Sequence, residues 1–219
     1  TLVGSPPNLI TARLLSGAGA NFGFMEWLVL GLPMALLLGV VVYASVTDVR
    51  TKLIPNALTF PAMLGGLVLW TIAGLATGKG LGLPGAMEGT LSASFLGLMA
   101  GLVPFVLLVF VGGLGMGDAK LMGAVGALSG QWEVVLGTTI YALVVAAAMG
   151  LVTMVRTGRV KLTAYRLLGV ALSGGKTVKP DELPDSPTVP FAVAIAAGAA
   201  VAGAELMVGL WPPNPLIWP

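Results

Sequence analysis

Long runs of apolar residues, separated by short polar or glycine-rich breaks, dominate this chain of 219 residues. A helix that crosses a bilayer needs about 20 apolar residues. Five of the runs reach that length and one, in the middle of the chain, is shorter. The pattern predicts these spans: Trp27–Thr47, Ala57–Thr77, Thr90–Gly112, Ala119–Gly130, Gln131–Val155 and Val189–Trp211. We therefore expect an all-α, polytopic integral membrane protein with about six transmembrane helices.

The segments outside these runs suggest the domain organisation. Residues 1–24 contain too much Gly, Pro and Ser for a span, and we expect a flexible or interfacial N-terminal arm. Residues 25–219 are predicted to form a single six-helix membrane domain with one long hydrophilic loop at residues 156–188. Within that loop, Val160–Leu172 mixes basic and apolar residues. It is either a short amphipathic helix on the membrane surface or an ordinary solvated connector.

The basic residues fix the expected orientation. Six alternating spans place nine of the 11 Lys and Arg residues on the face that holds the long loop: Arg50, Lys52, Lys120, Arg156, Arg159, Lys161, Arg166, Lys176 and Lys179. The opposite face keeps Arg13 and Lys79. Positive charge concentrates on the cytoplasmic side of membrane proteins, so the loop face is expected to be cytoplasmic. A five-span arrangement would divide the basic residues between both faces.

Composition supports this class and narrows the chemistry. Charged residues make up 9% of the chain and the mean hydropathy is +0.98, whereas soluble domains carry about 25% charged residues. The 32 glycines suit close helix packing in lipid. With no histidine and no cysteine, the chain offers no cysteine nucleophile, serine–histidine pair or thiolate zinc site. We expect no cofactor and no metal, membrane lipids as partners, and no nucleic-acid partner at a net charge of +2.

Two of the four aspartates, Asp48 and Asp118, directly follow apolar stretches and fall on the predicted cytoplasmic face. A carboxylate beside lipid is costly and is treated as functional by default. Since no stronger nucleophile is available, the two acids suggest carboxylate-pair chemistry at the membrane. The alternatives are an acidic helix cap for Asp118 and a surface ion pair with Arg50 for Asp48.

Each aspartate lies in a distinctive local sequence. Asp118 follows Gly115 and Gly117, and such glycines allow a tight turn and a close approach to a partner. Asp48 is followed by Pro55 and Asn56, where the proline can open the next helix and the amide can serve its end.

The two motifs are Asp-x-Arg-x-x-x-Ile-Pro-Asn, from Asp48, and Gly-x-Gly-Asp-x-Lys-Leu, from Gly115. In this order and beside these spans, they resemble the type IV prepilin peptidases, polytopic aspartyl proteases of bacterial and archaeal membranes that are grouped with preflagellin peptidases. The resemblance runs from about Trp27 to Trp211. Presenilin-like proteases share Gly-x-Gly-Asp, but their other aspartate follows a tyrosine and they carry Pro-Ala-Leu, and this chain has neither.

The resemblance implies that Asp48 and Asp118 are the catalytic pair. It places the residues that shape the site around them: Gly115, Gly117, Lys120, Pro55 and Asn56. The implied substrate is a prepilin-like precursor, of a Tad/Flp pilin or a preflagellin, that is cleaved after a glycine at the cytoplasmic face of the inner membrane. Family members with a cysteine-rich, zinc-binding insertion also methylate the new N-terminus. Because this chain has no cysteine, we expect a peptidase without N-methyltransferase activity.

In such a pair, one carboxyl keeps its proton and polarises the scissile carbonyl while the other activates water. Either aspartate can take either role, because the two titrate as a coupled unit. Two other functions compete with the peptidase: an ion- or proton-coupled transporter with membrane-edge aspartates, and an assembly scaffold whose aspartates only cap helices.

Overall fold

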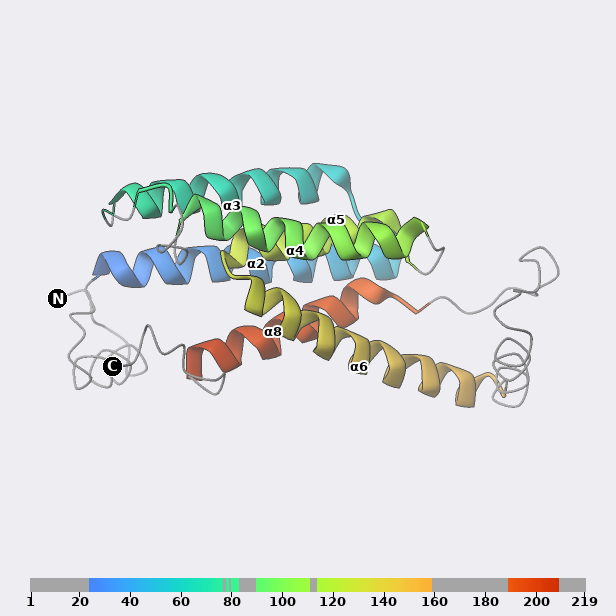
Figure 1. Ribbon diagram of the computed structural model, residues 1–219. Helices are drawn as coiled ribbons and strands as arrows, with labels where there is room; N and C mark the ends of the chain where they lie inside the picture. The colour runs from blue at the N-terminus through green and yellow to red at the C-terminus, as the bar shows by residue number, and fades with distance from the viewer. Residues whose placement is uncertain are drawn as a thin grey trace.

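The computed structural model describes residues 24–76, 78, 80–82, 90–110, 114–158 and 189–208. Over these residues the regular structure is entirely helical, as predicted. The helices are α2 (Phe24–Thr51), α3 (Asn56–Ala76), α4 (Leu91–Phe110), α5 (Met116–Ser129), α6 (Trp132–Arg156) and α8 (Phe191–Val208). Figure 1 shows α3, α4 and α5 gathered along α2, with α6 and α8 crossing each other below them.

Among the residues that the structure describes, four helices are long and apolar enough to cross a membrane: α2, α3, α4 and α6. A shorter apolar helix covers Phe191–Glu205 of α8. Large apolar side chains stand on the outside of the bundle, among them Val42, Leu64, Leu107 and Leu151, each more than half exposed. Exposed leucines and valines on this scale suit contact with lipid tails. The chain is therefore a multi-pass membrane protein.

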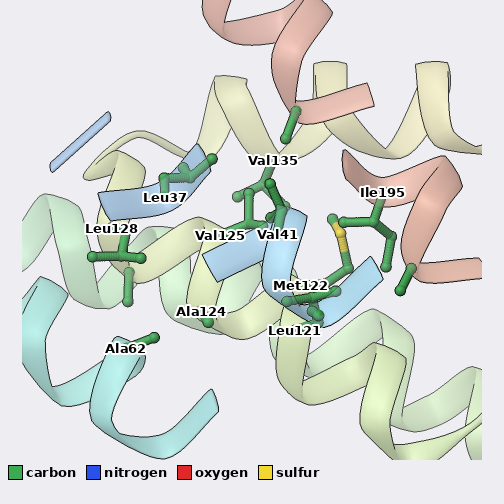
Figure 2. Packing of buried hydrophobic residues seen from close by; sticks show 14 of the residues in the cluster. Leu37, Val41, Ala62, Leu121, Met122, Ala124, Val125, Leu128, Val135 and Ile195 are labelled. Carbon is green, nitrogen blue, oxygen red and sulfur yellow. The ribbon is translucent and has the colours of Figure 1, made fainter. Parts of the chain in front are cut away.

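Helix α5 differs from the others because it lies inside the bundle. Every residue of Leu121–Gly130 is buried, and α5 contacts α2, α3, α4, α6 and α8. Figure 2 shows its side chains meeting those of its neighbours in one cluster: Leu121, Met122, Val125 and Leu128 of α5 with Leu37, Val41, Ala62, Val135 and Ile195. At 14 residues α5 is shorter than a span, and its apolar sequence serves the protein core.

Small residues let α4 and α5 approach almost to backbone contact. Gly97 and Gly101 of α4 lie against the backbone of Gly126 and Met122. A methyl group added to Gly101 would lie 2.7 Å from the carbonyl carbon of Met122 and would collide with it. This spacing of two glycines four residues apart is the arrangement that lets helix backbones pack closely in membranes.

Hydrogen bonds from neighbouring helices fix the buried end of α5. The Ser94 hydroxyl donates to the Ala127 carbonyl at 2.7 Å, and the Trp70 indole N–H donates to the Leu128 carbonyl at 2.9 Å. Carbonyls in the last turn of a helix lack an intrahelical donor, so these side chains supply it. These bonds fix the position of α5 along the bundle, and with it the position of its N-terminal end at Met116.

The helix bounds lie within three residues of the predicted spans except at the end of the first, and α5 begins at Met116 where the predicted span begins at Ala119. Helix α2 continues past Thr47 to Thr51, so Asp48 lies inside its last turn and not in a loop after it. The chain then turns at Lys52, which has a φ of 54° and whose N–H donates to the Asp48 carbonyl at 2.8 Å. Apart from Phe24, the predicted N-terminal arm lies outside the described residues, as do residues 159–188 of the predicted loop.

Candidate active site

The two predicted aspartates lie at the same end of the bundle because α2 ends where α5 begins. Asp48 is in the last turn of α2 and Asp118 in the first turn of α5, ahead of the fully buried part of that helix. Both side chains are half-buried. The pKa of the Asp118 carboxyl is raised from 3.8 to about 6, mainly by burial and also by the nearby Asp48 carboxylate, while a backbone hydrogen bond at Gly115 lowers it. The two carboxyls are therefore within electrostatic reach of each other.

A third helix contacts this pair, which the sequence did not reveal. Asp48 Oδ2 accepts a hydrogen bond of 3.2 Å from the backbone N–H of Ala192, in the first turn of α8. One turn before Asp48, the single O–H of Ser45 is shared between the carbonyl of the same Ala192, at 3.0 Å, and the Val41 carbonyl of its own helix, at 2.7 Å. Pro190 directly precedes α8, and its carbonyl accepts a hydrogen bond of 3.3 Å from the N–H of Val193.

The two glycines before Asp118 matter because they leave room for neighbouring groups, and not because the backbone has an unusual conformation. Gly115 caps α5 in an extended conformation, with φ −81° and ψ 147°, that any residue adopts. A methyl group on Gly115 would lie 3.2 Å from Asp118 Oδ2, and one on Gly117 would lie 3.2 Å from the Cβ of Ile54. The glycines thus admit the Asp118 carboxylate on one side and the α2–α3 connection on the other.

The remaining predicted site residues join α3 to α5 beside the aspartates. Pro55 directly precedes α3, and its carbonyl accepts the first hydrogen bonds of that helix, from Leu58 at 3.0 Å and Thr59 at 3.3 Å. Asn56 Oδ1 accepts a hydrogen bond of 2.9 Å from Lys120 Nζ. That ammonium also lies 5.2 Å from the centre of the Phe60 ring, within the range of a cation–π contact.

The arrangement offers two coupled acids, a cation two residues from one of them and a helix N-terminus on the other. Two neighbouring carboxyls do not both ionise cheaply, and such a pair can hold one proton and transfer it. No group of three or more acidic side chains that could hold a metal occurs in the part of the chain that the structure describes.

Comparison with known proteins shows the family to which the chain is similar. A sequence profile described as the type IV leader peptidase family matches residues 34–152, more than half of the chain and a stretch that includes both aspartates. Proteins named prepilin leader peptidase/N-methyltransferase from two strains of Burkholderia pseudomallei, 1026b and K96243, are each 34% identical over 171 residues, which is 76% of this chain and 50% of theirs. A protein of the same name from Myxococcus xanthus DK1622 is 27% identical over 158 residues, 69% of this chain and 42% of its own.

The chain thus spans about half the length of the curated relatives it matches. No solved structure matches it. The matched profile ends at residue 152, before α8 begins, so the contact between Asp48 and Ala192 joins a residue inside the matched stretch to one outside it.

Proposed function

The chain belongs to the type IV leader peptidase family, and on that premise we propose that it is a membrane aspartyl endopeptidase. Its substrates are prepilin-like precursors, of Tad/Flp pilins or preflagellins, and it removes their short basic leader at the cytoplasmic face of the membrane. The observation that carries the proposal is the meeting of Asp48 and Asp118 at one end of the bundle, where the charge of one raises the pKa of the other.

The proposed reaction is hydrolysis without a covalent intermediate. The ionised aspartate takes a proton from water as the water oxygen bonds to the scissile carbonyl carbon. The protonated aspartate meanwhile hydrogen-bonds to the carbonyl oxygen and stabilises its developing charge. The tetrahedral intermediate then collapses, the C–N bond breaks, and the leaving nitrogen departs as an amine after receiving a proton from the pair.

The location of the pair suits a substrate that is half in lipid. Both aspartates lie at helix ends, and the basic residues Arg50, Lys52 and Lys120 lie at the same end of the chain's apolar segments. The positive-inside rule assigns that end to the cytoplasm. A precursor with a cytoplasmic leader and a hydrophobic helix would present its cleavage site at this depth.

The names of the relatives combine a leader peptidase with an N-methyltransferase, and the proposal carries over only the first activity. The aspartate pair is suited to proton transfer and water activation. The chain contains no cysteine with which to build the thiolate zinc site of methylating family members.

A cleavage assay tests the proposal. Membranes containing the wild-type protein and a candidate prepilin precursor should yield a product shortened by its leader, whereas Asp48→Asn and Asp118→Asn should each abolish cleavage. Glu133→Gln, which removes an acid from the first turn of α6, is the matched control and should cleave normally. Equal membrane insertion of all variants excludes a folding defect. Substantial cleavage by either aspartate variant would contradict the proposal.

The rival function, an ion- or proton-coupled transporter, receives less support from the geometry. Transport sites usually lie near the bilayer midplane on broken helices, but Asp48 and Asp118 lie in terminal turns. Flux measurements on reconstituted protein, with both Asp→Asn variants, would detect such an activity directly.

A further inference from the structure

Ala192 is held by α2 at both of its backbone polar groups. Its N–H donates to Asp48 Oδ2 at 3.2 Å and its carbonyl accepts from the Ser45 hydroxyl at 3.0 Å. Ser45 and Asp48 are three residues apart, and residues at this spacing share one face of a helix. Two adjacent side chains of α2 therefore fix the position of the first turn of α8.

The contact changes the electrostatic setting of Asp48. The last turn of a helix carries a partial negative charge, which disfavours the carboxylate of Asp48 on α2. The first turn of a helix carries a partial positive charge and N–H groups without an intrahelical acceptor. Ala192 brings such a group to the carboxylate from α8, so α8 offsets the unfavourable field of α2.

The hydrogen bond also assigns the two oxygens of the carboxyl group. A backbone N–H can only donate, so Oδ2 of Asp48 acts as an acceptor. A carboxylate that accepts a backbone hydrogen bond is stabilised in its ionised form. Asp118 also has such a bond, at Gly115, but burial and the charge of Asp48 outweigh it and raise the pKa of Asp118. No described residue donates a hydrogen bond to Oδ1, so Oδ1 is the less occupied oxygen and the one we assign to the proton of the attacking water.

We propose that Ser45 is a positioning residue that, through the backbone of Ala192, holds Asp48 as the ionised, water-activating member of the pair. Asp118 is then the protonated member that hydrogen-bonds to the scissile carbonyl. This inference rests on the proposed peptidase function and extends it by giving each aspartate its role. The pKa of Asp118, raised to about 6 mainly by burial, agrees with that division.

The chain offers a closely matched control for Ser45. The hydroxyl of Thr47 also lies on α2 and is nearer to Asp48 in sequence, but it donates only to carbonyls of its own helix, at Tyr43 (3.2 Å) and Ala44 (2.9 Å). Hydroxyls commonly make such bonds within a helix. Loss of the Thr47 hydroxyl therefore tests removal of a helical hydroxyl without loss of the contact to α8.

The experiment compares the steady-state kinetics of purified, lipid-reconstituted wild type, Ser45→Ala, Ser45→Thr and Thr47→Ala on a prepilin precursor. Ser45→Ala should lower kcat about 10-fold with an unchanged KM and an unchanged Tm, since displacement of a reacting group by a fraction of an ångström costs rate and not binding. Ser45→Thr keeps the hydroxyl and should recover most of the lost kcat. Thr47→Ala should behave as wild type.

The outcomes separate this inference from the proposed function. If Asp48→Asn is inactive but Ser45→Ala keeps the wild-type kcat, the peptidase function stands and the role of Ser45 is overturned. An equal loss in Ser45→Ala and Thr47→Ala, or a change confined to KM, overturns it as well. If Asp48→Asn cleaves normally, the proposed function itself fails.

Discussion

Lys120 Nζ donates a hydrogen bond of 2.9 Å to Oδ1 of Asn56, and so ties the first turns of α5 and α3 together beside Asp118. Lys120 is two residues from Asp118, and the same ammonium lies over the Phe60 ring. One cation thus contacts two residues of α3. The start of α5, which carries one of the two aspartates, is held laterally by this contact.

Loss of the hydrogen bond between Lys120 and Asn56 should lower the cleavage activity more than the stability of the fold. Asn56→Ala is expected to reduce kcat/KM severalfold, while the free energy of unfolding falls by less than about 1 kcal/mol because the pair is exposed. Asn56→Asp keeps an acceptor for the ammonium and should retain most of the activity. Cleavage rates and Tm of the two variants check the prediction. A large fall in Tm for Asn56→Ala would show that the contact is mainly structural.

The close approach of Ile54 to Gly117 predicts a clash that a second substitution relieves. Gly117→Ala should displace the first turn of α5 and lower cleavage about 10-fold or more, since its new methyl group would lie 3.2 Å from the Cβ of Ile54. Gly117→Ala combined with Ile54→Gly should recover activity, because glycine lacks the Cβ that the new methyl group would meet. Gly39→Ala is the control, because nothing lies within 4 Å of a methyl group there, and it should cleave normally. Failure of the double variant to recover would contradict the packing argument.

The raised pKa of Asp118 predicts that the contribution of this group to the stability of the folded protein falls as pH rises. With a folded pKa of about 6 and an ordinary value of 3.8, the folded state binds more protons than the unfolded state between these values. Stability from this group is therefore present below about pH 4 and is lost as pH rises through 6. The Tm of Asp118→Asn minus that of wild type should increase from pH 4 to pH 7, as measured in detergent. A difference that does not change with pH would contradict the raised pKa.

The carboxyl group of Glu205 joins two helices, α6 and α8, at a distance from the aspartates. The Tyr141 hydroxyl of α6 donates to Glu205 Oε1 of α8, and Glu205 Oε2 is buried without a hydrogen-bond partner among the described residues. Tyr141→Phe should lower Tm by a few degrees, because both oxygens of Glu205 then lack a donor. Tyr141→Phe with Glu205→Leu should regain stability, since apolar groups need no partner.

Thermal unfolding in detergent measures this effect. Tyr43→Phe provides the control, because Tyr43 is an exposed side chain on α2 and its loss of a hydroxyl should leave Tm unchanged. An equal loss of stability in Tyr43→Phe, or no recovery in the double variant, would show that the Tyr141–Glu205 hydrogen bond does not hold α6 and α8 together.

The lengths of the apolar runs predicted most of the helices, but they did not show whether a helix is surrounded by lipid or by protein. The run from Ala119 to Gly130 reads as a short span because a leucine buried in protein and one in lipid have the same hydropathy. In the structure this segment is the buried part of α5, enclosed by the other helices. The sign of that difference in the sequence was the shortness of the run, 12 residues from Ala119 to Gly130.

The aspartate pair was predictable because alternating spans bring Asp48 and Asp118 to one face. The contact of Asp48 with Ala192 was not, because it joins residues 144 positions apart through a backbone N–H that any residue possesses. Ser45 gave no sign either, since a serine within a helix ordinarily bonds the carbonyl four residues before it, as Ser45 also does at Val41.

The enclosure of α5 has a consequence for biosynthesis. A helix enclosed by other helices reaches its final place only as its neighbours assemble around it. Asp118 travels with α5, and the helix that contacts Asp48 is α8, the last that the structure describes. A chain still emerging from the ribosome therefore lacks the completed aspartate pair, and under the proposed function it would cleave no precursor until α8 has joined the bundle.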